Sequence, residues 1–146
     1  MTDIAASALP ASRAKSTHAG AVHGAPGLIL RLEAAAVFIG AVWAYDAIGG
    51  SWASFAILFL VPDLSMLGYL AGRRIGAAAY NVGHGYLGPA AAGAAGLALH
   101  RVGLEWVALI WIAHIGFDRL LGFGLKYPEA FGATHLGWSA KARAGA

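Results

Sequence analysis

The chain has 146 residues, of which 59% are hydrophobic and 12% charged, and its mean hydropathy is +0.65. A soluble domain carries about 45–50% apolar and about 25% charged residues, so this composition excludes an ordinary soluble domain. The formal charge is +3, but no basic stripe with interleaved aromatics is present, which excludes nucleic-acid binding. Cysteine is absent, which removes disulfides, thiolate chemistry and iron–sulfur ligation.

The elements predicted from the apolar pattern begin after a tail, residues 1–27, that is rich in Ala, Ser and Gly and that we expect to be disordered. Four apolar blocks then follow, each about 20 residues long, which is the length needed to cross a bilayer core. The predicted helices cover about 28–48, 52–71, 75–99 and 104–124. They form one transmembrane domain, residues 28–124, and a juxtamembrane segment and tail, residues 125–146, ends the chain.

The turns between these helices predict their orientation. Lys and Arg gather in the N-terminal tail, in the turn at Arg73 and Arg74, and in the C-terminal segment, whereas the first turn has none. Because cytoplasmic loops carry the excess of Lys and Arg, both termini are predicted to be cytoplasmic. The third helix is built from Ala and Gly, which predicts that it is the central, least lipid-exposed helix. The predicted fold is an all-α, integral membrane bundle of four transmembrane helices with both termini cytoplasmic.

Five ionisable side chains interrupt the apolar helices, and an intramembrane charge is costly enough to need a structural or functional reason. They are Glu33, Asp63, His84, His114 and Asp118. With the predicted orientation and ~1.5 Å of rise per residue, all five lie roughly 7–15 Å from the cytoplasmic end of their helices. The sequence therefore predicts one polar layer in the cytoplasmic half of the bundle, contributed by all four helices.

Helical spacing supports a shared direction for several of these groups. His114 and Asp118 are four residues apart, so they share one face of their helix. His84 has Tyr80 four residues before it and Asn81 three before it, on one side of the third helix. The polar groups are therefore expected to face the bundle interior rather than lipid.

Two histidines and two or three carboxylates in one layer favour a divalent metal, because imidazole and carboxylate suit zinc, manganese or iron. The predicted ligands are Asp63, His84, His114 and Asp118, and His135 could fold back over the cytoplasmic mouth as a further one. A bound metal with an open position lowers the pKa of a coordinated water and creates a hydrolytic nucleophile.

Two further residues are expected to serve this chemistry. Glu33 is a candidate ligand or general base, and Arg119 is a candidate for holding a phosphate or pairing with a carboxylate. The expected activity is hydrolysis of a lipid-like or phosphorylated substrate by a membrane-embedded, metal-dependent enzyme. Glu33 could equally form an interfacial pair with Arg31, whose long side chain can reach the headgroups.

A second interpretation assigns no catalysis to these residues. Buried polar side chains commonly satisfy helix–helix contacts, so the layer could be a structural network or a proton or ligand relay in an accessory subunit. A third interpretation lets His84 and His114 bind one haem from both faces, although carboxylates at that depth suit a porphyrin poorly. The small residues of the third helix allow close packing within the chain, in an oligomer or in a larger complex.

Four motifs also carry a family resemblance. The runs VPDLSMLGY at 61–69, YNVGHGY at 80–86, AHIGFDR at 113–119, and GFGLKYP at 122–128 with THLG at 134–137 resemble the bacterial family catalogued as domain of unknown function 4260. The resemblance covers about 28–138 and implies a small multi-helix inner-membrane protein without supplying an activity. The layout is loosely similar to membrane-bound metal-dependent hydrolases, but the Thr-His-Ser type of motif is missing.

Overall fold

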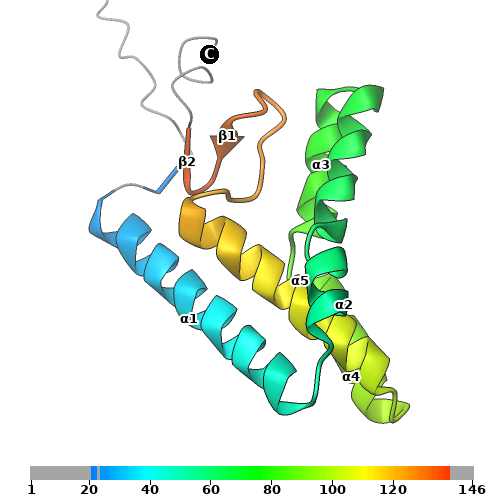
Figure 1. Ribbon diagram of the computed structural model, residues 1–146. Helices are drawn as coiled ribbons and strands as arrows, with labels where there is room; N and C mark the ends of the chain where they lie inside the picture. The colour runs from blue at the N-terminus through cyan, green and yellow to red at the C-terminus, as the bar shows by residue number, and fades with distance from the viewer. Residues whose placement is uncertain (1–20, 23, 139–146) are drawn as a thin grey trace, which may run out of the picture.

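A computed structural model describes residues 21–22 and 24–138 of the chain. The disordered tail predicted for residues 1–27 lies outside the described residues over 1–20, as does the basic tail at 139–146, whereas Ala25–Gly27 already belong to the first helix. The described part is all-α, with four helical stretches and a small hairpin near the C-terminus (Figure 1). This confirms the predicted all-α class, and two of the four stretches depart from the single helices that the sequence predicts.

The helical stretches are α1, α2 with the 3₁₀ helix η1, α3 with α4, and α5. Their bounds are Ala25–Ala47 for α1, Trp52–Leu58 for α2, Val61–Ala71 for η1, Arg73–Gly83 for α3, Leu87–Ala98 for α4 and Val102–Leu121 for α5. Strands β1 (Ala133–Thr134) and β2 (Gly137–Trp138) pair antiparallel, with Ala133 opposite Trp138.

The central helix is α5, which packs against α1 on one side and against α4 and α2 on others. A Cβ added at Gly116 would lie 2.9 Å from the backbone nitrogen of Phe38 and 3.1 Å from the carbonyl oxygen of Ala34, so glycine lets α1 and α5 approach closely. The buried residues of the described chain are concentrated on α5. The expectation that residues 75–99 form the central, least exposed helix is therefore wrong, and Val82 and Leu87 there are largely exposed.

The second stretch changes from α-helix to 3₁₀-helix after Leu58, and the 3₁₀ geometry organises its contact with α3. Side chains three residues apart align in a 3₁₀ helix. Added Cβ atoms at Gly83 and Gly68 would meet Ser65 and Ala79, respectively, at 2.8 Å. Small residues at this spacing therefore let η1 lie directly against α3, with Pro62 buried near its start.

The third stretch is broken at His84, Gly85 and Tyr86 rather than continuous from 75 to 99. Pro89 lies in the first turn of α4. A proline ring clashes with the carbonyl four residues earlier, here that of Gly85, so an α-helix cannot continue through this point. His84 is consequently the residue that ends α3, where a side chain can turn inward.

The N-terminal and C-terminal segments meet at one end of the molecule. The backbone N–H of Val22 donates to the carbonyl of His135 at 2.8 Å. The η1–α3 hairpin reaches the same end, where Arg73 donates to the carbonyl of Glu129 at 3.4 Å. The turns after α1 and after α4 lie at the opposite end (Figure 1). This is the up-and-down arrangement that the predicted orientation requires.

Two stretches, Ala25–Ala47 and Trp52–Ala71, are long and apolar enough to cross a membrane. Only 11% and 6% of their most apolar windows are buried within the chain. A core helix of a soluble protein hides its apolar side chains, whereas Trp43, Ile57 and Leu70 here are at least 73% exposed. Large exposed apolar surface marks a protein or membrane interface.

Candidate metal centre

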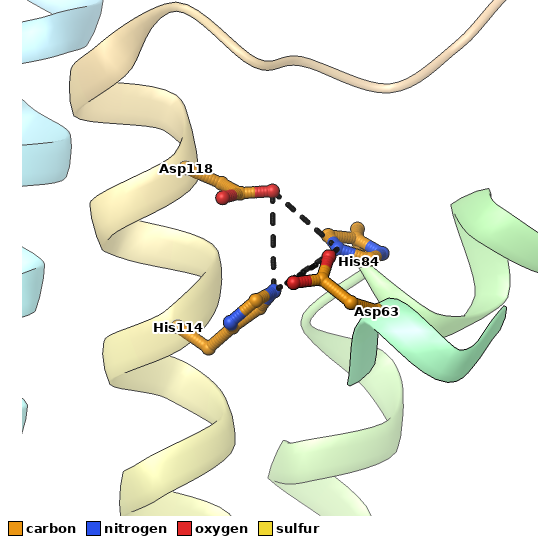
Figure 2. Close-up of side chains that lie close together, drawn as sticks. All are labelled: Asp63, His84, His114 and Asp118. Atoms are coloured by element: carbon orange, nitrogen blue, oxygen red, sulfur yellow. Dashed lines mark hydrogen bonds and ion pairs between the residues drawn. The ribbon is translucent and has the colours of Figure 1, made fainter. Parts of the chain in front are cut away.

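Four ionisable side chains from three elements converge beside α5 (Figure 2). Asp63 comes from the first turn of η1, His84 ends α3, and His114 and Asp118 lie one turn apart on α5. One potential ligand atom from each lies within 4.8 Å of all the others. The structure thus brings together the four predicted ligands that come from the second, third and fourth apolar blocks.

The distances within this cluster match the edges of a small coordination polyhedron. The Nε2 atoms of His84 and His114 lie 3.1 Å apart. Asp63 Oδ1 lies 3.4 Å from the first and 3.6 Å from the second, and Asp118 Oδ2 lies 3.4 and 3.9 Å from them. Tetrahedral zinc with ligands at about 2.0–2.1 Å has edges of about 3.3 Å. The donor set of two imidazoles and two carboxylates also suits such an ion.

Tyr80 makes two hydrogen bonds that prepare ligands of the cluster. Its carbonyl oxygen accepts from Nδ1–H of His84 at 3.0 Å. This bond selects the tautomer of neutral His84 whose Nε2 carries a lone pair, and Nε2 is the atom that faces the cluster. The Tyr80 hydroxyl donates to Oδ2 of Asp118 at 3.1 Å, and its ring stacks on that of His84 with centroids 3.7 Å apart.

Burial leaves the cluster open on one side. The side chains of His84 and His114 are 3% and 2% exposed, that of Asp118 is 16% exposed and that of Asp63 is 39% exposed. The ring of Phe59 packs edge-on against His114, at 5.3 Å between centroids. A water or substrate would therefore reach the cluster beside Asp63.

A lysine in the C-terminal segment lies close to the cluster. Lys126 is 8% exposed, and its Nζ lies 3.4 Å from the centroid of the Phe131 ring and 4.5 Å from that of Tyr80. Burial lowers the pKa of Lys126, while the carboxylates of Asp118 and Asp63 act to raise it. The cation therefore offsets part of the negative charge of the two aspartates.

Asn81 fixes this segment in place. Its side-chain oxygen accepts from the backbone N–H of Lys126 at 2.7 Å, and its amide nitrogen donates to the carbonyl of Lys126 at 3.0 Å. The polar face of α3 thus serves the cluster through His84 and holds the C-terminal segment through Asn81. Sequence reasoning missed Lys126 because it follows the last apolar block, where helical spacing gives no direction.

The other predicted site residues, Glu33, Arg119 and His135, lie elsewhere. All three line a separate cavity of about 160 Å³ between α1, α5 and the C-terminal segment. Nδ1 of His135 accepts from the backbone N–H of Leu125 at 2.8 Å. None of them belongs to the converging group of four. The roles expected for these residues in metal binding and catalysis stay predictions.

These features define an all-α protein with membrane-length apolar helices and a buried cluster of two histidines and two aspartates. The chain belongs to the family described as domain of unknown function DUF4260, which matches residues 27–138. The resemblance of the four sequence motifs is thereby confirmed. Comparison with curated proteins and with solved structures finds no match.

Proposed function

We propose that the protein is a multi-pass protein of the bacterial inner membrane that binds one divalent metal and hydrolyses a lipid-like or phosphorylated substrate. The observation that supports this most is the convergence of two Nε2 atoms and two carboxylate oxygens, with the tautomer of His84 already set by Tyr80. Ligating histidines characteristically donate their other ring N–H to a carbonyl or carboxylate. Helix bundles build metal sites in their cores from side chains on facing helices, as these four ligands from three elements would do.

The burial of each ligand suggests its role in this proposal. His84, His114 and Asp118 are enclosed and would hold the ion, which when bound would lower the pKa of a coordinated water. Asp63 is the most exposed of the four, so it is the ligand beside which water or substrate would enter. Lys126 would limit the negative charge of the site, and the exposed apolar helices would keep the substrate's tails close to it.

The metal content of the purified protein tests this proposal. We expect about one zinc, manganese or iron per chain after purification in mild detergent, measured by inductively coupled plasma mass spectrometry. The variants His84→Asn, His114→Asn and Asp118→Asn should each lose the metal. The matched control is His100→Asn, because His100 is an exposed histidine in a turn, with a positive φ of 51° that asparagine tolerates.

Asp63→Asn separates ion retention from turnover. If Asp63 lies at the substrate side, this variant should keep more metal than Asp118→Asn and still lose hydrolysis of short-chain phospholipid or phosphate-ester substrates. Metal-free protein from every mild preparation, with all variants folded, would refute the metal centre.

The alternative of a non-enzymatic polar network has one specific observation in its favour. Without a metal, Nε2–H of His114 can donate directly to Nε2 of His84 at 3.1 Å, so these two ring nitrogens pair with each other, while Nδ1 of His114 is buried without a hydrogen-bond partner in the described chain. If the cluster is such a network, the histidine variants would lower the free energy of unfolding, and no metal would be present to lose. Two rings in direct hydrogen-bond contact leave no slot for a porphyrin between them, and so this geometry does not support the haem interpretation.

The orientation is part of the proposal. We propose that both termini and the Arg73–Arg74 turn face the cytoplasm, supported by the common end at which the hairpin of η1 and α3 meets the C-terminal segment. A reporter fused after Ala146 should report a cytoplasmic location. A periplasmic signal would invert the orientation and move the metal centre to the other half of the bilayer.

A further inference from the structure

The cavity between α1, the C-terminal half of α5 and the C-terminal segment is separate from the cluster of four ligands. Its volume is about 160 Å³. Its polar lining consists of Glu33, Tyr86, Arg119 and His135. Apolar residues of α1, including Leu30 and Val37, complete the lining. Pockets for drug-sized ligands measure about 300–1,000 Å³, so this one accommodates a small polar group rather than a whole lipid.

Arg119 supplies a cation without a partner carboxylate. Its guanidinium carbon lies 4.4 Å from the centroid of the Tyr86 ring, in a cation–π stack. Within residues 21–22 and 24–138, no carboxylate lies within ion-pair distance of this arginine. A stacked guanidinium keeps its in-plane N–H groups available for an anion, and their fork matches a phosphate.

His135 supplies a neutral donor next to that cation. Its Nδ1 is already an acceptor for the backbone N–H of Leu125, so the neutral ring carries its hydrogen on Nε2. Burial, together with the charge of Arg119, lowers the pKa of His135, which keeps the ring neutral at neutral pH. The cavity therefore offers a cation and a neutral N–H donor from two different elements.

Glu33 makes the cavity selective. It is exposed on α1 and makes no ion pair with Arg119 in the described part of the chain. A cation and a carboxylate that line one small cavity without neutralising each other suit a ligand with both charges. On the same helix, Leu30 and Val37 are more than a third exposed, and they extend the cavity with apolar surface.

We propose that this cavity binds the headgroup of a zwitterionic phospholipid, a phosphate ester that carries an amine. Its phosphate lies against Arg119 and His135, its ammonium group against Glu33, and its acyl chains along the exposed apolar face of α1. The proposal takes only the membrane location from the proposed function and does not require the metal.

Binding of short-chain lipids to the full-length protein in detergent tests this site. The probes are dihexanoyl phosphatidylethanolamine, dihexanoyl phosphatidic acid and soluble phosphoethanolamine, followed by isothermal titration calorimetry. Arg119→Gln should weaken phosphatidylethanolamine binding about tenfold or more, because a charge-assisted hydrogen bond is lost. Arg119→Lys should restore part of the affinity. The control Arg101→Gln makes the same charge change at the other end of α5 and should leave binding within about twofold.

Glu33→Gln gives the sharper result. Removing the carboxylate should weaken the binding of phosphatidylethanolamine, because its ammonium group loses the ion pair with Glu33. It should strengthen the binding of phosphatidic acid, because this anionic lipid no longer meets a like charge. His100→Asn should leave both affinities unchanged, because His100 belongs neither to this cavity nor to the metal centre.

Several outcomes would overturn the proposal. Absence of phosphatidylethanolamine binding by the wild-type protein is one, and equal losses in Arg119→Gln and Arg101→Gln are another. If Glu33→Gln changes the affinity for both lipids in the same direction, the carboxylate does not recognise the amine. If soluble phosphoethanolamine binds as tightly as the lipid, the ligand is a soluble phosphate ester and the assignment to a lipid is wrong.

Discussion

Replacing Tyr80 with phenylalanine isolates one hydrogen bond of the candidate metal centre. The carbonyl that bonds to Nδ1 of His84 belongs to the backbone and stays, as does the ring that stacks on the imidazole. The cation–π contact with Lys126 also stays. What is lost is the 3.1 Å bond from the phenol hydroxyl to Oδ2 of Asp118.

The expected size of the effect follows from the role of that bond. Partners that orient a metal ligand are worth about 10–100-fold in affinity. This corresponds to about 1.4–2.7 kcal/mol of binding free energy. Because Asp118 is only 16% exposed, little water is available to replace the lost donor, which favours the upper part of this range.

Tyr69→Phe is the matched control. Tyr69 lies on η1, and its hydroxyl is buried without a hydrogen-bond partner in the described chain. Removing a buried hydroxyl that makes no hydrogen bond should not lower stability, and it touches no ligand of the cluster. The assay is a competition titration of the purified variants against a chromophoric zinc chelator, with a thermal melt of each to show that it is folded.

The outcome that refutes this reasoning is equal zinc affinity of Tyr80→Phe and Tyr69→Phe. In that case the Tyr80 hydroxyl does not position a ligand, and Asp118 is either outside the coordination sphere or oriented by other contacts. A fall in thermal stability of Tyr80→Phe with no metal in the wild type would instead support the structural network.

Three further predictions concern packing, the C-terminal segment and pH. Gly116→Ala should cost about 1–3 kcal/mol in a thermal or denaturant melt because its Cβ meets the backbone of α1 below 3.2 Å. Gly40→Ala, whose Cβ meets nothing within 4 Å, should instead stabilise by about 0.5–1 kcal/mol; equal effects would contradict the close approach. Asn81→Leu removes two hydrogen bonds to the backbone of Lys126 and should speed trypsin cleavage after that residue, read by mass spectrometry. Burial lowers the pKa of His135 below its ordinary 6.5, so its contribution to stability is present above about pH 6.5 and lost as the pH falls below it; a melt of His135→Gln should show a weaker acid dependence.

Helix register explains why four of the predicted ligands meet. Three antiparallel stretches place the four ligands at similar depths: Asp63, His84, His114 and Asp118. The side chain of Asp63 still meets the other three, although its segment is the 3₁₀ helix η1 rather than an α-helix. Helical spacing could also have predicted that Arg119 points away from the cluster. It follows Asp118 by one residue, about 100° around the helix, so it faces the α1 side.

Other features could not be predicted because they depend on tertiary contacts. The 3₁₀ geometry of η1 is stabilised by small residues that fit against α3, and small residues alone do not indicate a helix type. The break after His84 is an exception, because Pro89 signals it in the sequence: the proline ring clashes with the carbonyl of Gly85. His135 lies in a segment without helical periodicity, and its position depends on hydrogen bonds to Leu125 and Val22.

The four ligands are spread along the chain, and this has a consequence for biogenesis. Asp118 is synthesised last of the four, after η1 and α3. The cluster is therefore incomplete until α5 docks against the earlier helices, and a metal that cross-links three segments would close two long loops at that moment. Metal loading would thus be a late step, and the amount of bound metal would report how much of the protein has finished folding.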